Sequence, residues 1–173
     1  SNSAGVLFGA IDTSKFQGNL VTLPIVNTDA GSSSAPIQIV VTLNSLSYMK
    51  TSDNTEAKLA EGAIGALLDT GTTLTYMPSN VVTAIVNQFD MQYSSSLGYY
   101  TFECANASNY SFAFDFQGLS IEAPMTSFLI SLLDGSGNTS DLCAFGIQST
   151  SDSYMTLGDS FLKSVYMVVD LET

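Results

Sequence analysis

A buried strand that ends in an acid constrains this chain more than any other feature of its sequence. The stretch 64-IGALLDTGTTLTYMPSNVV-82 places Asp69 directly after an apolar run, and Thr70-Gly71 follows at once. Glycine adopts backbone angles that other residues avoid, so this dipeptide predicts a tight turn at the end of the strand. We expect the turn to aim the backbone N–H groups of Gly71 and Thr72, and the Thr72 hydroxyl, at the Asp69 carboxylate. A carboxylate that accepts several such bonds stays ionised at low pH.

The rest of the chain predicts a mainly β fold with one or two short helices. Its 173 residues, 45% of them hydrophobic, suffice for one domain with a core, and no linker divides them. The alternation of apolar residues predicts strands over Leu20–Val26, Ile37–Leu46, Phe112–Phe116, Leu119–Ile121 and Ser164–Leu171. The polar residues 50–62 are typical of an exposed connection.

One short helix is expected after the acid-bearing turn. Proline suits a first helical turn and serine is a good cap, so Pro78-Ser79 indicates a helix start. An apolar stripe at helical spacing follows, made of Val81, Val82, Ile85, Val86 and Phe89.

The composition excludes several classes of function. Histidine is absent, which removes Ser-His-Asp and Cys-His catalysis and histidine zinc sites, so we expect no metal and no cofactor. The net charge of −12, with four lysines and no arginine, leaves no basic patch for nucleic acid. No apolar run approaches the length of a membrane span. Any acid–base chemistry must therefore rest on carboxylates.

Two cysteines and three glycosylation sequons lie close together in the second half of the chain. Cys104 and Cys143 could be free thiols, but the sequons that begin at Asn106, Asn109 and Asn138 favour an oxidising, secretory environment. Together they favour the interpretation of a secreted, disulfide-bonded glycoprotein.

A single held carboxylate is a poor catalyst, but two that face each other can share a proton. One then activates a water while the other protonates a substrate carbonyl, and no histidine or metal is needed. The tripeptide D-T-G alone is weak evidence, since an Asp-Gly turn between two strands explains it equally well.

The wider context of the motif is more specific. The run LLDTGTTLTY, a following proline and short helix, and 157-LGDSFLKSVYMVVDL-171 resemble the C-terminal lobe of pepsin-like aspartic proteases. The start, 5-GVLFGAIDTSKFQGNLVTLPIV-26, is similar to the family's F-G-x-x-D entry into that lobe. D-T-G-T-T-L-T-Y looks most like the fungal secreted and cell-surface branch, the candidapepsins and yapsins.

The resemblance assigns roles to individual positions. It makes Asp69 one of two catalytic aspartates, and Thr70 a buried threonine that bonds across to a matching loop. Gly71 and Thr72 would support the carboxylate, and Leu157 and Gly158 would support the loop. The residues that line the substrate cleft would be Gly71, Thr72 and Thr73. Cys104 and Cys143 stand where that lobe carries its disulfide.

The second catalytic motif is missing from the chain. Residues 1–173 contain no other D-T-G or D-S-G, and we expect them to be a C-terminal lobe whose partner is the N-terminal lobe or light chain of the same protease. Peptides or proteins would be the substrates, cleaved at acidic pH, and the protein would be secreted or held at the cell surface, for example by a lipid anchor outside this chain. The alternative is an inactive lobe that serves as a binding or surface-interaction module. Pairing of two identical copies is disfavoured, because the lobe resembles half of an unequal pair.

Overall fold

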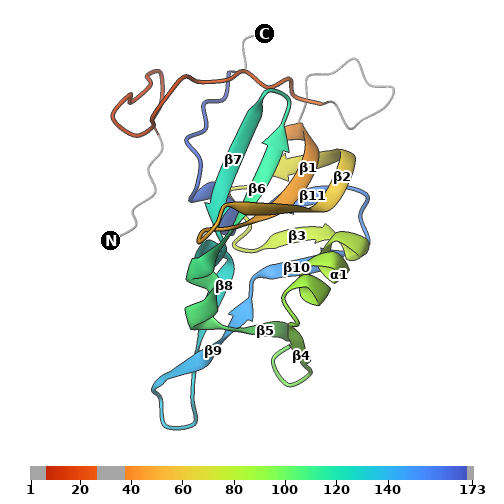
Figure 1. The fold of residues 1–173 in the computed structure, drawn as a ribbon. Coiled ribbons are helices and arrows are strands. Elements are labelled where there is room, and N and C mark those ends of the chain that lie inside the picture. The colour runs from red at the N-terminus through yellow and green to blue at the C-terminus, as the bar shows by residue number, and fades with distance from the viewer. Residues whose placement is uncertain (1–6, 27–37, 171–173) are drawn as a thin grey trace.

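In the computed structural model, residues 7–26 and 38–170 are described, and strands dominate (Figure 1). The larger sheet has seven strands in the order β10-β3-β11-β2-β1-β6-β7, and a smaller one has the order β4-β5-β9-β8. The larger sheet consists of β1 (Val40–Lys50), β2 (Thr55–Leu68), β3 (Thr75–Pro78), β6 (Tyr110–Phe116), β7 (Leu119–Pro124), β10 (Ile147–Thr150) and β11 (Met155–Leu157). The smaller consists of β4 (Gln92–Ser94), β5 (Tyr99–Glu103), β8 (Leu129–Leu133) and β9 (Thr139–Phe145). The prediction of a mainly β fold is confirmed.

Four short helical segments accompany the sheets within the described residues. They are the α-helices α1 (Ser79–Gln88) and α2 (Asp159–Leu162), and the 3-10 helices η1 (Cys104–Asn109) and η2 (Met125–Phe128). In this part of the chain no helix has the length and apolar character needed to cross a membrane. The predicted stripe on α1 is confirmed, because Val81, Val82 and Ile85 are buried. The predicted serine cap is wrong: Pro78 occupies the cap position, and no side chain caps the helix there.

The strand order brings two distant segments together at the end of β2. β11 lies between β2 and β3, parallel to β2 with Leu157 opposite Leu68, and antiparallel to β3 with Leu157 opposite Thr75. A parallel neighbour requires a long crossover, and here the chain between the two strands contains α1 and the whole smaller sheet. The residues that follow β2 and β11 therefore emerge side by side.

Aromatic rings fill the core beneath this junction. Phe112, Phe114 and Phe116 are at most 5% exposed, as their alternation in the sequence predicts. Phe114 packs against Phe161 of α2 with ring centroids 4.7 Å apart. This contact joins the centre of the core to the helix that follows β11.

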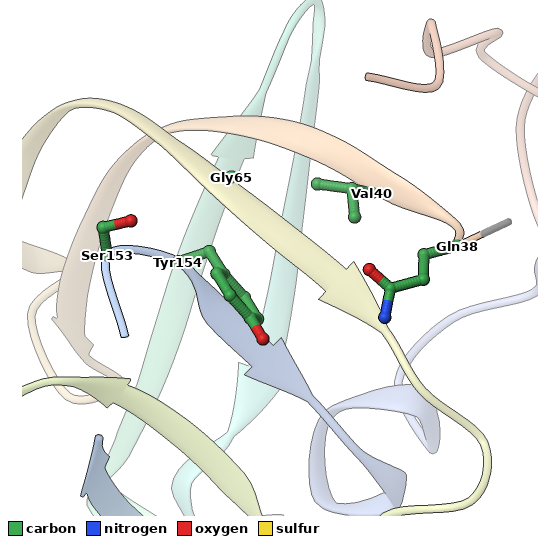
Figure 2. Close-up of a pocket in the computed structure, with 5 residues that line it drawn as sticks. All are labelled: Gln38, Val40, Gly65, Ser153 and Tyr154. Carbon is green, nitrogen blue, oxygen red and sulfur yellow. The ribbon is translucent and has the colours of Figure 1, made fainter. Parts of the chain in front are cut away.

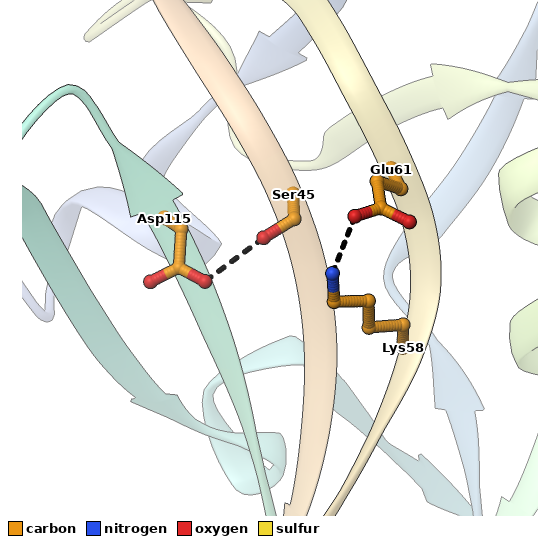
Figure 3. A network of polar contacts seen from close by, with 4 residues as sticks. All are labelled: Ser45, Lys58, Glu61 and Asp115. Atoms are coloured by element: carbon orange, nitrogen blue, oxygen red, sulfur yellow. Dashed lines mark hydrogen bonds and ion pairs between the residues drawn. The ribbon is translucent and has the colours of Figure 1, made fainter.

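The prediction of an exposed connection over residues 50–62 is confirmed for exposure but wrong for structure, because residues 55–62 belong to β2. The chain turns within four residues, where Asn54 has a φ of 53°, and β2 begins at Thr55. Its polar side chains lie on an outer face of the sheet, where Lys58 forms an ion pair with Glu61, and Ser45 on β1 donates a hydrogen bond to Asp115 (Figure 3). Strand pairing uses the backbone alone, so a polar segment can form a strand when an apolar neighbour supplies the register.

Two predicted strands near the ends of the described chain do not form. Residues 20–26 and 164–170 have no regular secondary structure, although the Val26 N–H donates to the Val40 carbonyl at 2.7 Å. The two end segments of the described chain, residues 7–26 and 164–170, contact each other through other residues. The Phe16 and Tyr166 rings lie 5.0 Å apart, and the Asp12 N–H donates to the Tyr166 hydroxyl at 2.8 Å. An apolar alternation becomes a strand only when its backbone pairs in a ladder with a neighbouring strand, and neither segment joins a described sheet. The first residues of the predicted strand 37–46 and the last of 164–171 lie outside the described residues.

A disulfide joins the 3-10 helix η1 to strand β9 of the smaller sheet. Cys104 at the start of η1 is bonded to Cys143 on β9, with their Cα atoms 5.2 Å apart and a sequence separation of 39. The bridge confirms the expectation drawn from the family resemblance and rules out free thiols at these positions.

Replacing both cysteines by serine is expected to lower the free energy of unfolding by about 4 kcal/mol, because a closed loop of this length restricts the unfolded chain. Urea unfolding of the variant and of the parent protein measures the difference. The parent protein with its disulfide reduced serves as the control and should show a similar loss. A change below about 1 kcal/mol would contradict a structural role for the bridge.

Candidate active site

Asp69 lies immediately after β2, and its carboxylate is held by two donors. The Gly71 backbone N–H donates to Oδ1 at 2.8 Å, and the Thr72 hydroxyl donates to Oδ2 at 2.6 Å. The Thr72 backbone N–H donates to the Asp69 carbonyl at 3.3 Å, so the prediction that it reaches the carboxylate is wrong. The Thr72 N–H closes the tight turn, and the Thr72 hydroxyl bonds to the Asp69 side chain instead.

Both donors stabilise the ionised form of the acid. The Thr72 hydroxyl, and after it the Gly71 N–H, hold the pKa of Asp69 below the value of 3.8 for a free aspartate, while the slight desolvation of the group acts in the opposite direction. Asp69 is half-buried, so its other lone pairs remain accessible. The site therefore presents a fixed carboxylate that keeps its charge to a lower pH than a free aspartate does.

The end of β11 supports the turn from below. The Asp69 N–H donates to the Leu157 carbonyl at 3.1 Å, which anchors the start of the turn. A Cβ atom on Gly158 would lie 2.2 Å from the Leu74 carbonyl oxygen and 2.3 Å from that of Thr72. Only glycine fits at this position, and the loop can approach β11 so closely for that reason. Leu157 and Gly158 thus lie where the resemblance places the supporting residues.

The first residues of α2 continue the same contact. The Asp159 N–H donates to the Thr72 carbonyl at 2.8 Å, and the Ser160 N–H donates to the Thr73 carbonyl at 3.1 Å. The buried hydroxyls of Ser160 and Thr75 share a hydrogen bond of 2.7 Å. Sequence reasoning missed Ser160, since nothing in the spacing of two hydroxyl residues 85 positions apart indicates that they meet.

The top of the loop is open to solvent. Thr70, Gly71 and Thr73 are exposed and Thr72 is half-buried. Thr70 was expected to be a buried threonine bonded to a matching loop; within this chain it is exposed. Contact of Gly71, Thr72 and Thr73 with a substrate stays a prediction, as does glycosylation of the exposed Asn106 and Asn109 on η1 and Asn138 between β8 and β9.

A pocket of about 370 Å³ lies along β2 before the turn. It is lined by Gln38, Val40, Gly65, Ser153 and Tyr154. Figure 2 shows Tyr154 on one side of β2 and Val40 and Gln38 on the other, with Gly65 between them. Because Gly65 has no side chain, the floor of the pocket stays open. Only the isolated glycine in the apolar run IGALL signalled this feature in the sequence.

The chain is similar to known proteins over almost its whole length. The model of a family described as eukaryotic aspartyl protease matches residues 1–173. Aspartic proteinase 3 of Saccharomyces cerevisiae is 46% identical over 169 residues, covering 96% of this chain and 28% of that protein. Yapsin-3 of the same yeast is 37% identical, with 99% of this chain and 33% of that protein covered. Secreted aspartic protease 9 of Candida albicans is 35% identical, with 99% and 31% covered. The chain thus spans about a third of the length of these relatives.

Changing Gly158 to alanine is expected to destabilise the fold by at least about 3 kcal/mol, because the new methyl group would overlap two carbonyl oxygens that the loop holds in place. Thermal or urea unfolding measures the loss. Gly65→Ala is the matched control: its Cβ would meet Tyr154 and Val40 at 3.5 Å, an ordinary contact, so stability should change by less than about 0.5 kcal/mol. Equal effects of the two substitutions would contradict the close approach at Gly158.

Removing the Thr72 hydroxyl is expected to raise the pKa of Asp69 toward 3.8, because the largest stabiliser of its charge is lost. In the parent chain this carboxylate contributes stability above the unfolded pKa, and the contribution disappears as pH falls through the lower folded pKa. When the pH falls below 3.8, the free energy of unfolding of Thr72→Val should therefore decrease by less than that of the parent chain. Titration of the Asp69 carboxyl carbon by NMR measures the shift. Thr73→Val is the control, and an unchanged Asp69 titration in Thr72→Val would refute the assignment.

Proposed function

The chain belongs to the eukaryotic aspartyl proteases, and on that premise we propose that it is the C-terminal lobe of an endopeptidase whose second catalytic aspartate lies in an N-terminal lobe outside these 173 residues. The observation that carries the proposal is the Asp69 carboxylate, held by Gly71 and Thr72 at an open strand end. By itself this lobe would be inactive, because one carboxylate cannot both accept and supply a proton in the same step.

In the proposed mechanism one carboxylate acts as a general base and the other as a general acid. The pair shares one proton, and the bonds from Gly71 and Thr72 favour the ionised form of Asp69, which leaves the shared proton on the partner aspartate in this proposal. The ionised oxygen takes a proton from a water whose oxygen bonds to the peptide carbonyl carbon, while the partner's proton moves to the carbonyl oxygen. The tetrahedral intermediate then collapses: Asp69 gives its proton to the amide nitrogen, one hydroxyl of the intermediate returns a proton to the partner aspartate, and the C–N bond breaks to leave a carboxylic acid and an amine. No metal, cofactor or covalent enzyme intermediate takes part.

Because one carboxylate must act as a base and the other as an acid, the proposed activity should have its optimum at acidic pH. At low pH the pair gains a second proton and the base is lost. At higher pH the remaining shared proton leaves and the acid is lost. The two limits belong to the coupled pair rather than to either residue.

The end segments provide a surface for the missing lobe. Apolar side chains exposed on them include Leu7, Phe8, Ile11, Leu20, Val21, Val168 and Val169, and Phe8 is 89% exposed. Exposed apolar patches of this kind usually mark an interface. Since the curated relatives are about three times as long as this chain, we propose that the remainder of such a protein covers these residues.

The substrate would lie along the open loop and extend toward the pocket of Figure 2. Gly65 precedes Asp69 by four residues on β2, a distance of about 13 Å, so the pocket would receive a side chain about four residues from the scissile bond. The net charge of −12 favours peptides with basic residues.

We propose an extracellular location, secreted or at the cell surface, with any lipid anchor outside this chain. The Cys104–Cys143 bridge supports an oxidising compartment, and one relative is named a secreted aspartic protease.

In the complete protein, Asp69→Asn is expected to lower kcat/KM for an unstructured peptide by at least about 10³-fold, because an amide cannot accept the proton of the water. The assay runs across pH 2–7. Asp141→Asn, which removes the same charge from an exposed position on β9, is the control and should keep full activity. Full activity with asparagine at position 69 would refute the proposal. A complete parent protein without any peptidase activity would instead favour a binding module.

A further inference from the structure

A second pocket, of about 350 Å³, lies where the end of α1 meets β5 and η1, away from the Asp69 turn. We call it the α1–η1 pocket. Three half-buried rings belong to its lining: Phe89, Phe102 and Tyr110. Phe89 meets Phe102 with centroids 5.9 Å apart and Tyr110 with centroids 5.0 Å apart, both edge to face. The pocket therefore has an aromatic base fixed by mutual packing, large enough for a small ligand.

The remaining lining residues are polar and exposed. Gln88 and Asp90 come from the end of α1, and Asn106 and Asn109 from η1. Asp90 has a φ of 49°, and Asn54 is the other non-glycine residue with a positive φ in the described chain. Such a backbone is kept where the surroundings require it. Amide and carboxylate groups around aromatic rings suit a saccharide, because a pyranose ring has an apolar C–H face and an edge of hydroxyl groups.

Two of these polar residues are themselves glycan acceptors. Asn106 and Asn109 each begin an N-x-S sequon, and side chains three residues apart on a 3-10 helix lie one above the other. Both side chains therefore reach the same pocket. A sugar attached to either amide nitrogen would begin its path at the edge of the aromatic base.

We propose that the α1–η1 pocket seats the first sugar of an N-linked glycan carried by Asn106 or Asn109. In the attachment step the side-chain amide nitrogen bonds to C1 of the sugar, the amide loses a proton, and the lipid pyrophosphate of the oligosaccharide donor leaves. The bound sugar then packs on the rings, and its polar groups face Gln88 and Asp90. Because attachment is covalent, the pocket meets its ligand at a high effective concentration and needs little intrinsic affinity.

The two acceptors differ in when they can be modified. The sequon hydroxyl of Asn109 belongs to Ser111, which is 3% exposed and donates to Glu122 on β7 at 2.6 Å. The hydroxyl of the Asn106 sequon belongs to Ser108, which is exposed. Glycosylation at Asn109 must therefore precede the pairing of β6 with β7, whereas Asn106 stays open in the folded chain.

The test uses the complete protein secreted from a glycosylating eukaryotic host. Glycopeptide mass spectrometry first shows which asparagines carry sugar. A glycan amidase is then applied to the native and the unfolded protein, and removal is timed at each site. We expect release from Asn106 or Asn109 to be at least about tenfold slower than from Asn138 in the native protein, and equal after unfolding, because a seated sugar must leave the pocket first.

A substitution in the aromatic base distinguishes a sugar bound in the pocket from slow release that is caused by steric crowding alone. Phe102→Leu keeps an apolar side chain but removes a ring, and it should abolish the slow release. Tyr93→Leu is the matched control, since Tyr93 is a 59% exposed ring outside the pocket, and it should leave the slow release intact. The proposal fails if neither Asn106 nor Asn109 carries a glycan, if release is equally fast at all sites, or if Phe102→Leu changes nothing. It also fails if free N-acetylglucosamine binds the pocket of the native glycoprotein, since the pocket would then be empty and serve an external sugar.

Discussion

The close contact between Gly158 and the carbonyl groups of the Asp69 loop is the constraint on which the site depends. Those carbonyls leave no space for a side chain at position 158, and the N–H groups of Asp159 and Ser160 donate to the loop from the next residues. The loop therefore rests on β11 and α2 through its backbone, and its conformation depends little on the identity of its exposed side chains. This backbone contact therefore sets the position of the Asp69 carboxylate.

The contact is rigid because α2 is itself anchored in the core. Phe161 packs on Phe114, which belongs to the ring row of β6, and α2 is too short to hold itself without that packing. Ring packing in the core thus holds the four-residue helix α2, and the N–H groups at the start of α2 hold the loop that carries the acid. The hydrogen bonds from Gly71 and Thr72 add the electrostatic part, since they stabilise charge on an acid whose place is already set.

Local sequence predicted the parts of the structure that local chemistry determines. The turn after Asp69, the stripe on α1 and the phenylalanine row on β6 each follow from the chemistry and spacing of neighbouring residues, and all are present. Prediction failed where pairing decides the outcome. Residues 55–62 form a strand because β1 lies beside them, whereas residues 20–26 join neither sheet and make a backbone bond to β1 only from Val26 to Val40 among the described residues. The Ser160–Thr75 bond joins distant residues, and a single sequence carries no record of such pairs.

The parallel pairing of β11 with β2 also bears on the order in which the chain folds. Asp69 and Leu157 are about ninety positions apart, and contacts of this separation form slowly because much of the chain must be ordered first. Hairpins such as β1–β2 and β6–β7 can form early, from neighbouring residues. We therefore expect the supported carboxylate to reach its final geometry late in folding, after these hairpins. A nascent or partly unfolded chain would therefore carry the aspartate before the loop that holds its carboxylate has formed.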